Sequence, residues 1–390
     1  MKHISRTIWI LSLVSLFTDT ASEMLYPVMP IYLKSIGFSV LFIGILEGIA
    51  EATAGLSKAY FGKLSDASGK RLPFVQAGYA LSAISKPMMA LFRFPVWVFF
   101  SRTLDRLGKG VRTGARDAML SEEATPETKG KVFGFHRSMD TLGAVLGPAI
   151  ALVFLYFHPN QYNFLFFIAF LPGFLAIVAS FLLNDKTRPE SKQIQKFTFF
   201  SSFKYWRESS IEYRKLLGGL LFFALMNSSD VFLLLKAKES GLGDTQVIAV
   251  YIFYNLVYAL SAFPLGILAD RVGLRKMFMF GVAIFATVYI CMGFQTNFYM
   301  MAALFFMYGI YAAATEGISK AWISNISEKQ DVATAIGTYS GFQSIATMFS
   351  SSIAGLVWYN FGAAKTFLIS GIGAVLVLVY FMLNISNSKK

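Results

Sequence analysis

The sequence predicts an all-α membrane protein, and three observations point to this fold class. Of its 390 residues, 55% are hydrophobic and only 15% are charged, whereas soluble domains carry roughly a quarter charged residues. The apolar residues come in long blocks, each near the length of about 20 residues that a spanning helix needs. One loop motif also recurs in the second half of the chain, which indicates two similar bundles of helices.

The apolar blocks between polar breaks predict twelve spans. They cover residues 8–33, 39–61, 73–92, 96–118, 132–157, 163–183, 215–236, 246–268, 277–294, 299–323, 333–358 and 364–384. We therefore expect an N-terminal six-helix bundle over 1–184, a cytoplasmic central linker over 185–214 and a C-terminal six-helix bundle over 215–390. The even number of spans places both termini on the same side of the membrane.

Lysine and arginine residues predict the orientation. They concentrate in the loops on the side of the N-terminus, for example Lys63, Lys70 and Lys129, and in the middle segment. Short loops rich in these residues stay in the cytoplasm, so both termini are expected inside. The formal net charge of +13 then faces the anionic inner leaflet, and nucleic acid is not an expected partner. The expected location is the inner membrane of a bacterium.

Several classes of function lack the residues that they require. The single cysteine, Cys291, excludes a disulfide framework, and three scattered histidines do not make a metal site. Gly108-Lys109-Gly110 lacks the full phosphate-loop pattern, which argues against an ATP-driven pump. We see no Ser-His-Asp set in plausible register, so an enzyme is not expected, and neither is a metal or a cofactor.

The recurring motif follows the second and the eighth span. The first copy reads Gly62-Lys-Leu-Ser-Asp66-Ala-Ser-Gly69-Lys70-Arg71, and the second reads Gly266-Ile-Leu-Ala-Asp270-Arg271-Val-Gly273-Leu-Arg275. Gly, Leu, Asp, Gly and Arg recur in identical register. The halves are therefore expected to be parallel repeats related by an axis along the membrane normal.

This loop resembles the signature loop of the major facilitator superfamily, and its echo in the second half is typical of that family. The resemblance covers essentially the whole chain. It implies two six-helix bundles related by pseudo-two-fold symmetry, which work by alternating access. The first copy has Ala67 where the family usually has Arg, whereas the second copy has Arg271. The first loop is therefore expected to depend on Lys70 and Arg71.

A physical role in gating can be derived for the loop residues. Glycine allows a tight turn and close helix approach, Asp66 can accept backbone N–H groups, and the basic residues can pair with an acid, for which Asp117 is the expected partner. The alternative is a positive-inside hairpin without a gating role. The predicted gating residues are Gly62, Asp66, Gly69, Lys70, Arg71, Asp117, Gly266, Asp270, Arg271, Gly273 and Arg275.

Ionisable residues inside the predicted spans are functional candidates, because charges at membrane depth are costly. Asp19 and Glu23 lie four residues apart, as do Glu47 and Glu51, so each pair shares one helix face. A carboxylate desolvated in such a setting can carry a proton. The candidates for proton coupling are Asp19, Glu23, Glu47, Glu51 and Asp140.

The fourth span carries a basic stripe with helical spacing, formed by Arg102, Arg106, Lys109 and Arg116. The stripe could bind an anionic solute, since guanidinium groups pair well with carboxylate and phosphate, or it could neutralise the acids above. In the second half, Glu316 and Lys320 are close enough to pair with each other. The candidates for the substrate cavity are Arg102, Arg106, Lys109, His136, Arg137, Asn227, Asp230, Glu316 and Lys320.

Two further patterns resemble motifs of proton-coupled members of the family. Gly143-Ala-Val-Leu-Gly147-Pro148 in span five resembles a stretch of its antiporters, although Ala151 replaces the last glycine and close helix packing explains it equally well. Arg106 with Gly110 resembles the motif of span four, with Lys109 in place of its glutamine. Both favour proton coupling, and the first favours export.

The sequence therefore predicts a proton-coupled secondary active transporter of a small organic solute, which includes organic anions as a class. A multidrug or metabolite efflux antiporter, a lipid or lysolipid flippase and a membrane sensor without transport remain as alternatives. The expected partners are a small-molecule substrate and membrane lipid, and the expected state is a monomer.

Overall fold

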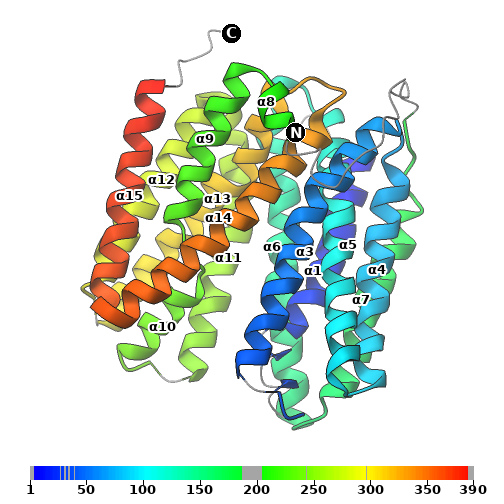
Figure 1. Ribbon diagram of the computed structural model, residues 1–390, viewed down its shortest axis with the longest axis vertical. Helices are drawn as coiled ribbons and strands as arrows, with labels where there is room; N and C mark the ends of the chain where they lie inside the picture. Colours follow the sequence, from blue (N-terminus) through cyan, green and yellow to red (C-terminus); the bar gives the residue numbers. More distant parts are fainter. Residues whose placement is uncertain are drawn as a thin grey trace. The chain divides into compact units, whose positions relative to one another are not determined.

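The computed structural model describes residues 4–26, 28–29, 32–33, 36–38, 40–186, 204–242, 244–295 and 297–384. These residues form helices joined by short connections, and no strand occurs among them (Figure 1). The helices are α1 (Arg6–Leu25), α3 (Val40–Ala67), α4 (Leu72–Leu91), α5 (Pro95–Glu122), η1 (Pro126–Thr128), α6 (Lys129–Phe157), α7 (Tyr162–Ser180), α8 (Tyr205–Glu208), α9 (Ile211–Met226), α10 (Val231–Glu239), α11 (Asp244–Val272), α12 (Leu274–Met292), α13 (Phe298–Ile326), α14 (Val332–Phe361) and α15 (Ala363–Asn384).

Each predicted span overlaps a helix in the described part of the chain, and the predicted fold class is confirmed. Three details differ from the prediction. The helix α1 ends at Leu25, whereas the first span was predicted to reach residue 33. The seventh span is not one helix, because α9 ends at Met226 and α10 begins at Val231. The helices α3 and α5 also run past the predicted ends of their spans, to Ala67 and Glu122.

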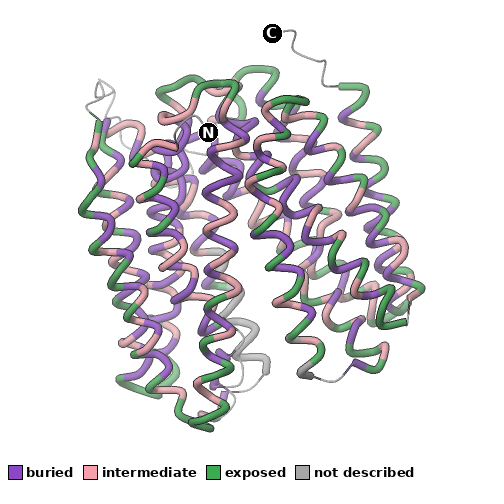
Figure 2. The backbone as a smooth tube through the Cα atoms, turned by 180° about the vertical axis from the view of Figure 1, so that it is seen from behind, coloured by how far each residue is buried: buried purple, intermediate pink, exposed green. Residues whose placement is uncertain are grey.

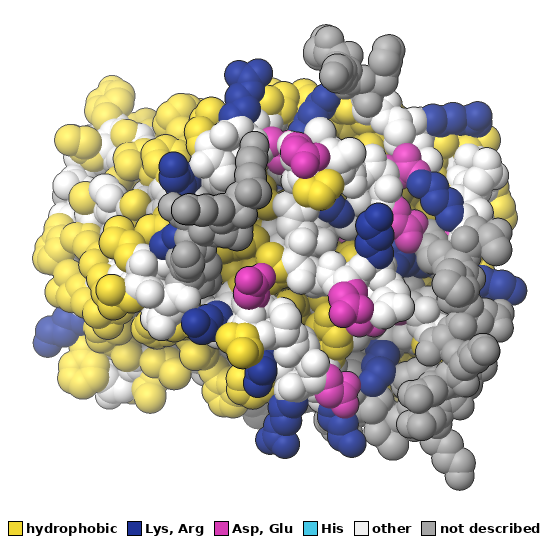
Figure 3. Space-filling model, turned by 90° about the horizontal axis from the view of Figure 1, so that it is seen from above, with side chains coloured by type: hydrophobic (Ala, Val, Ile, Leu, Met, Phe, Trp, Pro, Cys, Tyr) yellow, Lys and Arg dark blue, Asp and Glu magenta, His cyan; other side chains and the backbone are white. Residues whose placement is uncertain are grey.

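The surface of the helices suits a membrane. Eight helical stretches in the described residues are long and apolar enough to cross one, whereas α5 is rich in charged residues. Large hydrophobic side chains such as Val96, Phe181 and Leu260 are exposed, and Figure 2 shows exposed and buried positions alternating along the helices. Figure 3 shows the end where α9 begins and α15 ends, on which basic and acidic side chains gather.

The chain forms two compact units that do not follow the sequence halves strictly. Unit 1 comprises Met1–Thr125, Met139–Tyr205 and Glu328–Gly341, and unit 2 comprises Pro126–Ser138, Trp206–Ser327 and Phe342–Lys390. The start of α6 thus belongs to unit 2, and the start of α14 belongs to unit 1. Residues 187–203 of the predicted linker lie outside the described residues.

Within unit 1, α5 packs along α3 and α4, while α7 packs against α1 and α4. A hydrophobic cluster at one end of this unit is built around Tyr32, Leu165 and Phe166. Within unit 2, α13 packs along α11 and α12, and α15 packs against α12 and α9. These packings place α5, with its charges, and α13, with its tyrosines, in the interior of their units.

Candidate functional site

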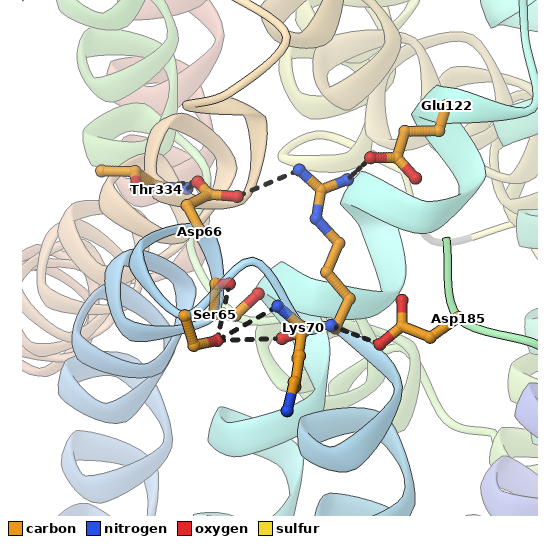
Figure 4. A network of polar contacts seen from close by, with 8 residues as sticks. Ser65, Asp66, Lys70, Glu122, Asp185 and Thr334 are labelled. Atoms are coloured by element: carbon orange, nitrogen blue, oxygen red, sulfur yellow. Dashed lines mark hydrogen bonds and ion pairs between the residues drawn. The ribbon is translucent and has the colours of Figure 1, made fainter. Parts of the chain in front are cut away.

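The first copy of the repeated loop attaches the end of α3 to the start of α14 within unit 1 (Figure 4). Asp66 Oδ2 accepts hydrogen bonds from the backbone N–H of Thr334 at 2.7 Å and from its hydroxyl group at 2.8 Å. Thr334 lies in the first turn of α14, where backbone N–H groups lack helical partners and favour a negative charge. Asp66 therefore caps α14.

Arg71 holds the same carboxylate from the side of α4. Its Nη2 lies 3.0 Å from Asp66 Oδ1, and its Nη1 lies 2.6 Å from Glu122 Oε1 at the end of α5. The side chains of Arg71 and Asp66 are only 1% and 5% exposed. Burial raises the pKa of Asp66 from 3.8 to about 6, although Arg71 and the Thr334 hydrogen bonds act in the opposite direction.

The prediction that Asp117 pairs with the basic residues of this loop is wrong. Asp117 Oδ1 instead forms an ion pair with Arg116 Nη2 at 2.9 Å, and its side chain is fully buried. Arg71 contacts Glu122, which lies five residues further along α5. Five residues turn a helix by about 140° beyond one full revolution, so the two acids face different directions.

The beginning of the predicted linker is fixed to the same network. Asp185 Oδ2 accepts hydrogen bonds from the backbone N–H groups of Arg71 and Leu72, both at 2.9 Å, and thereby caps the start of α4. Lys186 Nζ lies 2.7 Å from Glu123 Oε1. The loop, the end of α5 and the first linker residues therefore form one polar cluster (Figure 4).

The second copy of the loop makes the equivalent contact within unit 2. Asp270 accepts hydrogen bonds from the backbone N–H groups of Gly130 and Lys131, both at 2.7 Å, and so caps the start of α6. A Cβ atom on Gly266 would lie 3.0 Å from the carbonyl carbon of Gly130 and 3.1 Å from Gly134 Cα. The helices cross too closely there for a larger residue.

The other loop residues have different roles in the two copies. Gly69 and Gly273 adopt φ angles of +66° and +100°, which L side chains avoid. Arg275 Nη2 donates to the carbonyl oxygen of Phe381 at 2.7 Å, so it caps the end of α15 instead of bridging two acids as Arg71 does. Lys70 and Arg271 are exposed.

A small polar cavity of about 10 Å³ lies between α1 and α5 in unit 1, which is room for about one water molecule. Lys86 of α4 contacts two residues of its lining, since its Nζ lies 2.5 Å from Asp105 Oδ1 and 3.1 Å from Ser22 Oγ. The cavity brings together several predicted residues with others that were not predicted. Its lining is Asp19, Ser22, Glu23, Tyr26, Arg102, Asp105, Arg106, Lys109 and Arg112.

Two predicted acids from distant parts of the sequence meet next to this cavity. Asp19 on α1 and Asp140 on α6 lie close together, because α6 packs on α1 one turn after Asp140, where a Cβ atom on Gly143 would lie 3.1 Å from Asp19 Cβ. Asp140 Oδ1 also accepts a hydrogen bond from Ser15 Oγ at 2.5 Å, and Arg116 Nη1 donates to the same hydroxyl group at 3.3 Å. Two adjacent carboxyl groups can share a proton, because two ionised carboxylates repel each other and act only as hydrogen-bond acceptors.

The acids predicted on the second span, Glu47 and Glu51, lie on α3. Their side chains fall outside the described part of the structure, so their role stays a prediction. In unit 2, Glu316 pairs with Arg137 and not with Lys320. Arg137 also donates to the hydroxyl group of Tyr258. The predicted pairing of Glu316 with Lys320 is therefore wrong, because Arg137 of α6 forms the ion pair with Glu316 instead.

Three important residues were missed in the sequence. Lys86 is 1% exposed and lies in the middle of an apolar span, so the same argument that selected the acids would have found it. Glu122 and Asp185 gave no comparable signal, since both lie in polar stretches at predicted loop positions. Asn227 and Asp230 were found, but the helix break that contains them was not.

The sequence profile of the Major Facilitator Superfamily matches residues 11–243 and 216–390. The chain belongs to this superfamily. An uncharacterised major-facilitator-type transporter from Methanocaldococcus jannaschii is 30% identical over 381 residues, which span 96% of this chain and 94% of that protein. The superfamily and the fold identify the protein as a multi-pass membrane transporter.

Two further similarities are more limited. The quinolone resistance protein NorA from Staphylococcus aureus is 25% identical over 171 residues, which span 44% of this chain and 43% of that protein. The crystal structure of the human organic anion transporter MFSD10 superposes with a TM-score of 0.79 over 96% of this chain and 99% of that chain. At 16% identity, the second similarity supports the major facilitator fold alone.

Proposed function

We propose that this major facilitator protein is a proton-coupled secondary active transporter, which moves a small organic solute across a bacterial inner membrane by alternating access. The carboxyl pair of Asp19 and Asp140 carries the proposal. Asp140 is buried, Asp19 lines the polar cavity, and α6 packs on α1 beside both acids. We propose that the two carboxyl groups share one proton, because two adjacent ionised carboxylates repel each other. Exposure of the pair to water on one side of the membrane allows that proton to leave.

The basic residues around the pair support an organic anion as the first solute class to test. Arg102, Arg106 and Lys109 line the same cavity as Asp19 and Glu23. Guanidinium groups bind carboxylate and phosphate through paired hydrogen bonds. Because these cations and the proton-holding pair are adjacent, binding of an anion and release of a proton would affect each other electrostatically. We propose that the transporter acts as a monomer without a cofactor.

Efflux of drugs or metabolites is the second candidate. It is favoured by the partial similarity to a quinolone resistance protein and by the close packing of α6 on α1. A Cβ atom on Gly143 would lie 2.6 Å from the carbonyl oxygen of Leu16, and one on Gly147 would lie 2.6 Å from that of Thr20. A lipid or lysolipid flippase is a third candidate, and the lysolipids in the melting assay described below test it.

The test begins with ligand binding and continues with transport. The purified protein is melted in the presence of organic anions, lipophilic cations and lysolipids, because a ligand of the folded state raises the melting temperature. Compounds that stabilise it are then assayed in proteoliposomes with and without an imposed pH gradient. We expect the wild-type protein to accumulate or export the ligand only when the gradient is present.

Asp19→Asn and Asp140→Asn should each bind the ligand but lose the response to the pH gradient, because the amide can donate a hydrogen bond to the remaining carboxylate, which then needs no shared proton. Glu208→Gln, which changes an exposed acid on α8, is the matched control and should transport normally. Gradient-driven transport at wild-type rate in both aspartate variants would remove the pair from the mechanism. Stabilisation by lipophilic cations alone would favour drug efflux.

A further inference from the structure

The seventh span contains an interruption that the proposed proton coupling does not use. The helix α9 has 16 residues, so the interruption lies about 24 Å along the span at 1.5 Å per residue. Residues 227–230 are not helical, and α10 then completes the span. Non-helical backbone at membrane depth is tolerated only where protein or a polar site surrounds it. Interrupted helices of this kind form ion sites in other transporters.

Asp230 at the interruption is a carboxylate with unusual surroundings. Tyr254 donates a hydrogen bond to its Oδ2 at 2.6 Å, and Tyr308 donates to its Oδ1 at 2.5 Å. Both tyrosines are buried. Among the residues that the structure describes, no lysine, arginine or histidine forms an ion pair with Asp230. An ionised carboxylate in such a place needs a counter-charge.

The neighbouring residues offer further oxygen atoms. Asn227 Oδ1 and Ser228 Oγ are buried and accept no hydrogen bond from the described residues, and the side chain of Ser228 is 3% exposed. Asn227 is held in place because its Nδ2 donates to the hydroxyl group of Tyr311 at 2.8 Å. The last turn of α9 also ends here, where carbonyl groups lack a following helical turn.

We propose that this interruption is a binding site for a monovalent metal cation of the size of sodium, with Asp230 as its charged ligand and Asn227 Oδ1 and Ser228 Oγ as neutral ligands. A set of oxygen ligands suits a hard cation. One carboxylate balances one positive charge, which favours a monovalent over a divalent ion. The site lies within unit 2 and shares no residue with the carboxyl pair of unit 1, so it does not depend on the proposed proton coupling.

The site is tested by melting the purified protein in sodium, potassium and choline chloride at constant ionic strength and mildly alkaline pH. Sodium should raise the melting temperature in proportion to the logarithm of its concentration above the dissociation constant, and choline should have no effect. Asp230→Asn should abolish the sodium response. Ser228→Ala and Asn227→Ala, which keep the carboxylate, should weaken sodium binding by roughly tenfold each, equivalent to about 1.4 kcal/mol.

Asp19→Asn is the matched control, because it removes the proposed proton carrier of unit 1 and should keep the sodium response. Identical melting in all three salts, or a sodium response that survives Asp230→Asn, would overturn the proposal. A melting temperature that depends on Asp230 through pH but not through sodium would also overturn it, because a proton would then be the counter-charge. Failure of proton-driven transport in the wild-type protein would leave this site standing.

Discussion

At the scale of single residues, the buried ion pair of Lys86 and Asp105 gives a stability prediction. The two side chains are 2% and 6% exposed and lie 2.5 Å apart. Removal of one partner from a buried pair leaves an uncompensated charge and costs about 3–5 kcal/mol. We therefore expect Asp105→Asn to lower the melting temperature of the purified protein strongly. The double variant Lys86→Met/Asp105→Asn should recover most of the loss, because it removes the unpaired ammonium group and keeps an oxygen that can accept from Arg102, whose Nη1 lies 3.4 Å from Asp105 Oδ2.

An exposed ion pair provides the comparison at the same scale. Lys186 pairs with Glu123, but its side chain is 58% exposed, and such pairs contribute about 0–1 kcal/mol. Lys186→Ala should therefore leave the melting temperature nearly unchanged. An effect of Asp105→Asn that is as small as that of Lys186→Ala would mean that Lys86 has another way to satisfy its charge.

At the scale of helices, the contact between α3 and α14 should depend on pH. The pKa of Asp66 is about 6 in the folded protein and has its ordinary value of 3.8 in the unfolded chain. The folded protein therefore binds this proton more tightly. The resulting stabilisation is fully present below pH 4 and is lost as the pH rises through 6. Between pH 7 and pH 5 the gain should be about 1 kcal/mol.

This dependence is measured as the difference in melting temperature between the wild-type protein and Asp66→Asn over that pH range. The variant removes the titrating group but keeps an oxygen that can accept from Thr334, so other titrations cancel in the difference. The melting temperature of the wild-type protein should rise relative to that of the variant as the pH falls. If the melting temperature of the wild-type protein instead falls relative to that of the variant on acidification, the folded protein favours the carboxylate form of Asp66 over the acid form.

At the scale of the whole molecule, the helices and the repeated loop could be predicted from the sequence, whereas the ion-pair partners could not. Apolar blocks of spanning length predict helices because the backbone must satisfy its own hydrogen bonds in lipid. The repeated loop pointed to Asp66 and Asp270, which both cap helix starts, while their role in gating stays a prediction. The acid that pairs with Arg71 could not be predicted from the sequence. Glu122 contacts Arg71 in place of Asp117 because α5 runs on to Glu122, and helix length and rotation decide which acid faces inward.

The two caps lie in different units, which leads to a prediction about how the molecule combines their effects. Asp66 and Asp270 share no hydrogen-bond partner among the described residues. Effects of independent sites on the free energy of unfolding add to within about 0.5 kcal/mol. We expect the double variant Asp66→Asn/Asp270→Asn to be destabilised by the sum of the single changes, measured by thermal unfolding.

Asp66→Asn/Glu122→Gln provides the contrast, because both acids bind Arg71. Once one acid is neutralised, Arg71 depends more on the other, so the two changes should not add. A double-mutant cycle for each pair separates the cases. A coupling between Asp66 and Asp270 as large as that between Asp66 and Glu122 would mean that the caps respond to a common rearrangement of both units. Additive caps would instead allow each helix start to be released separately during transport.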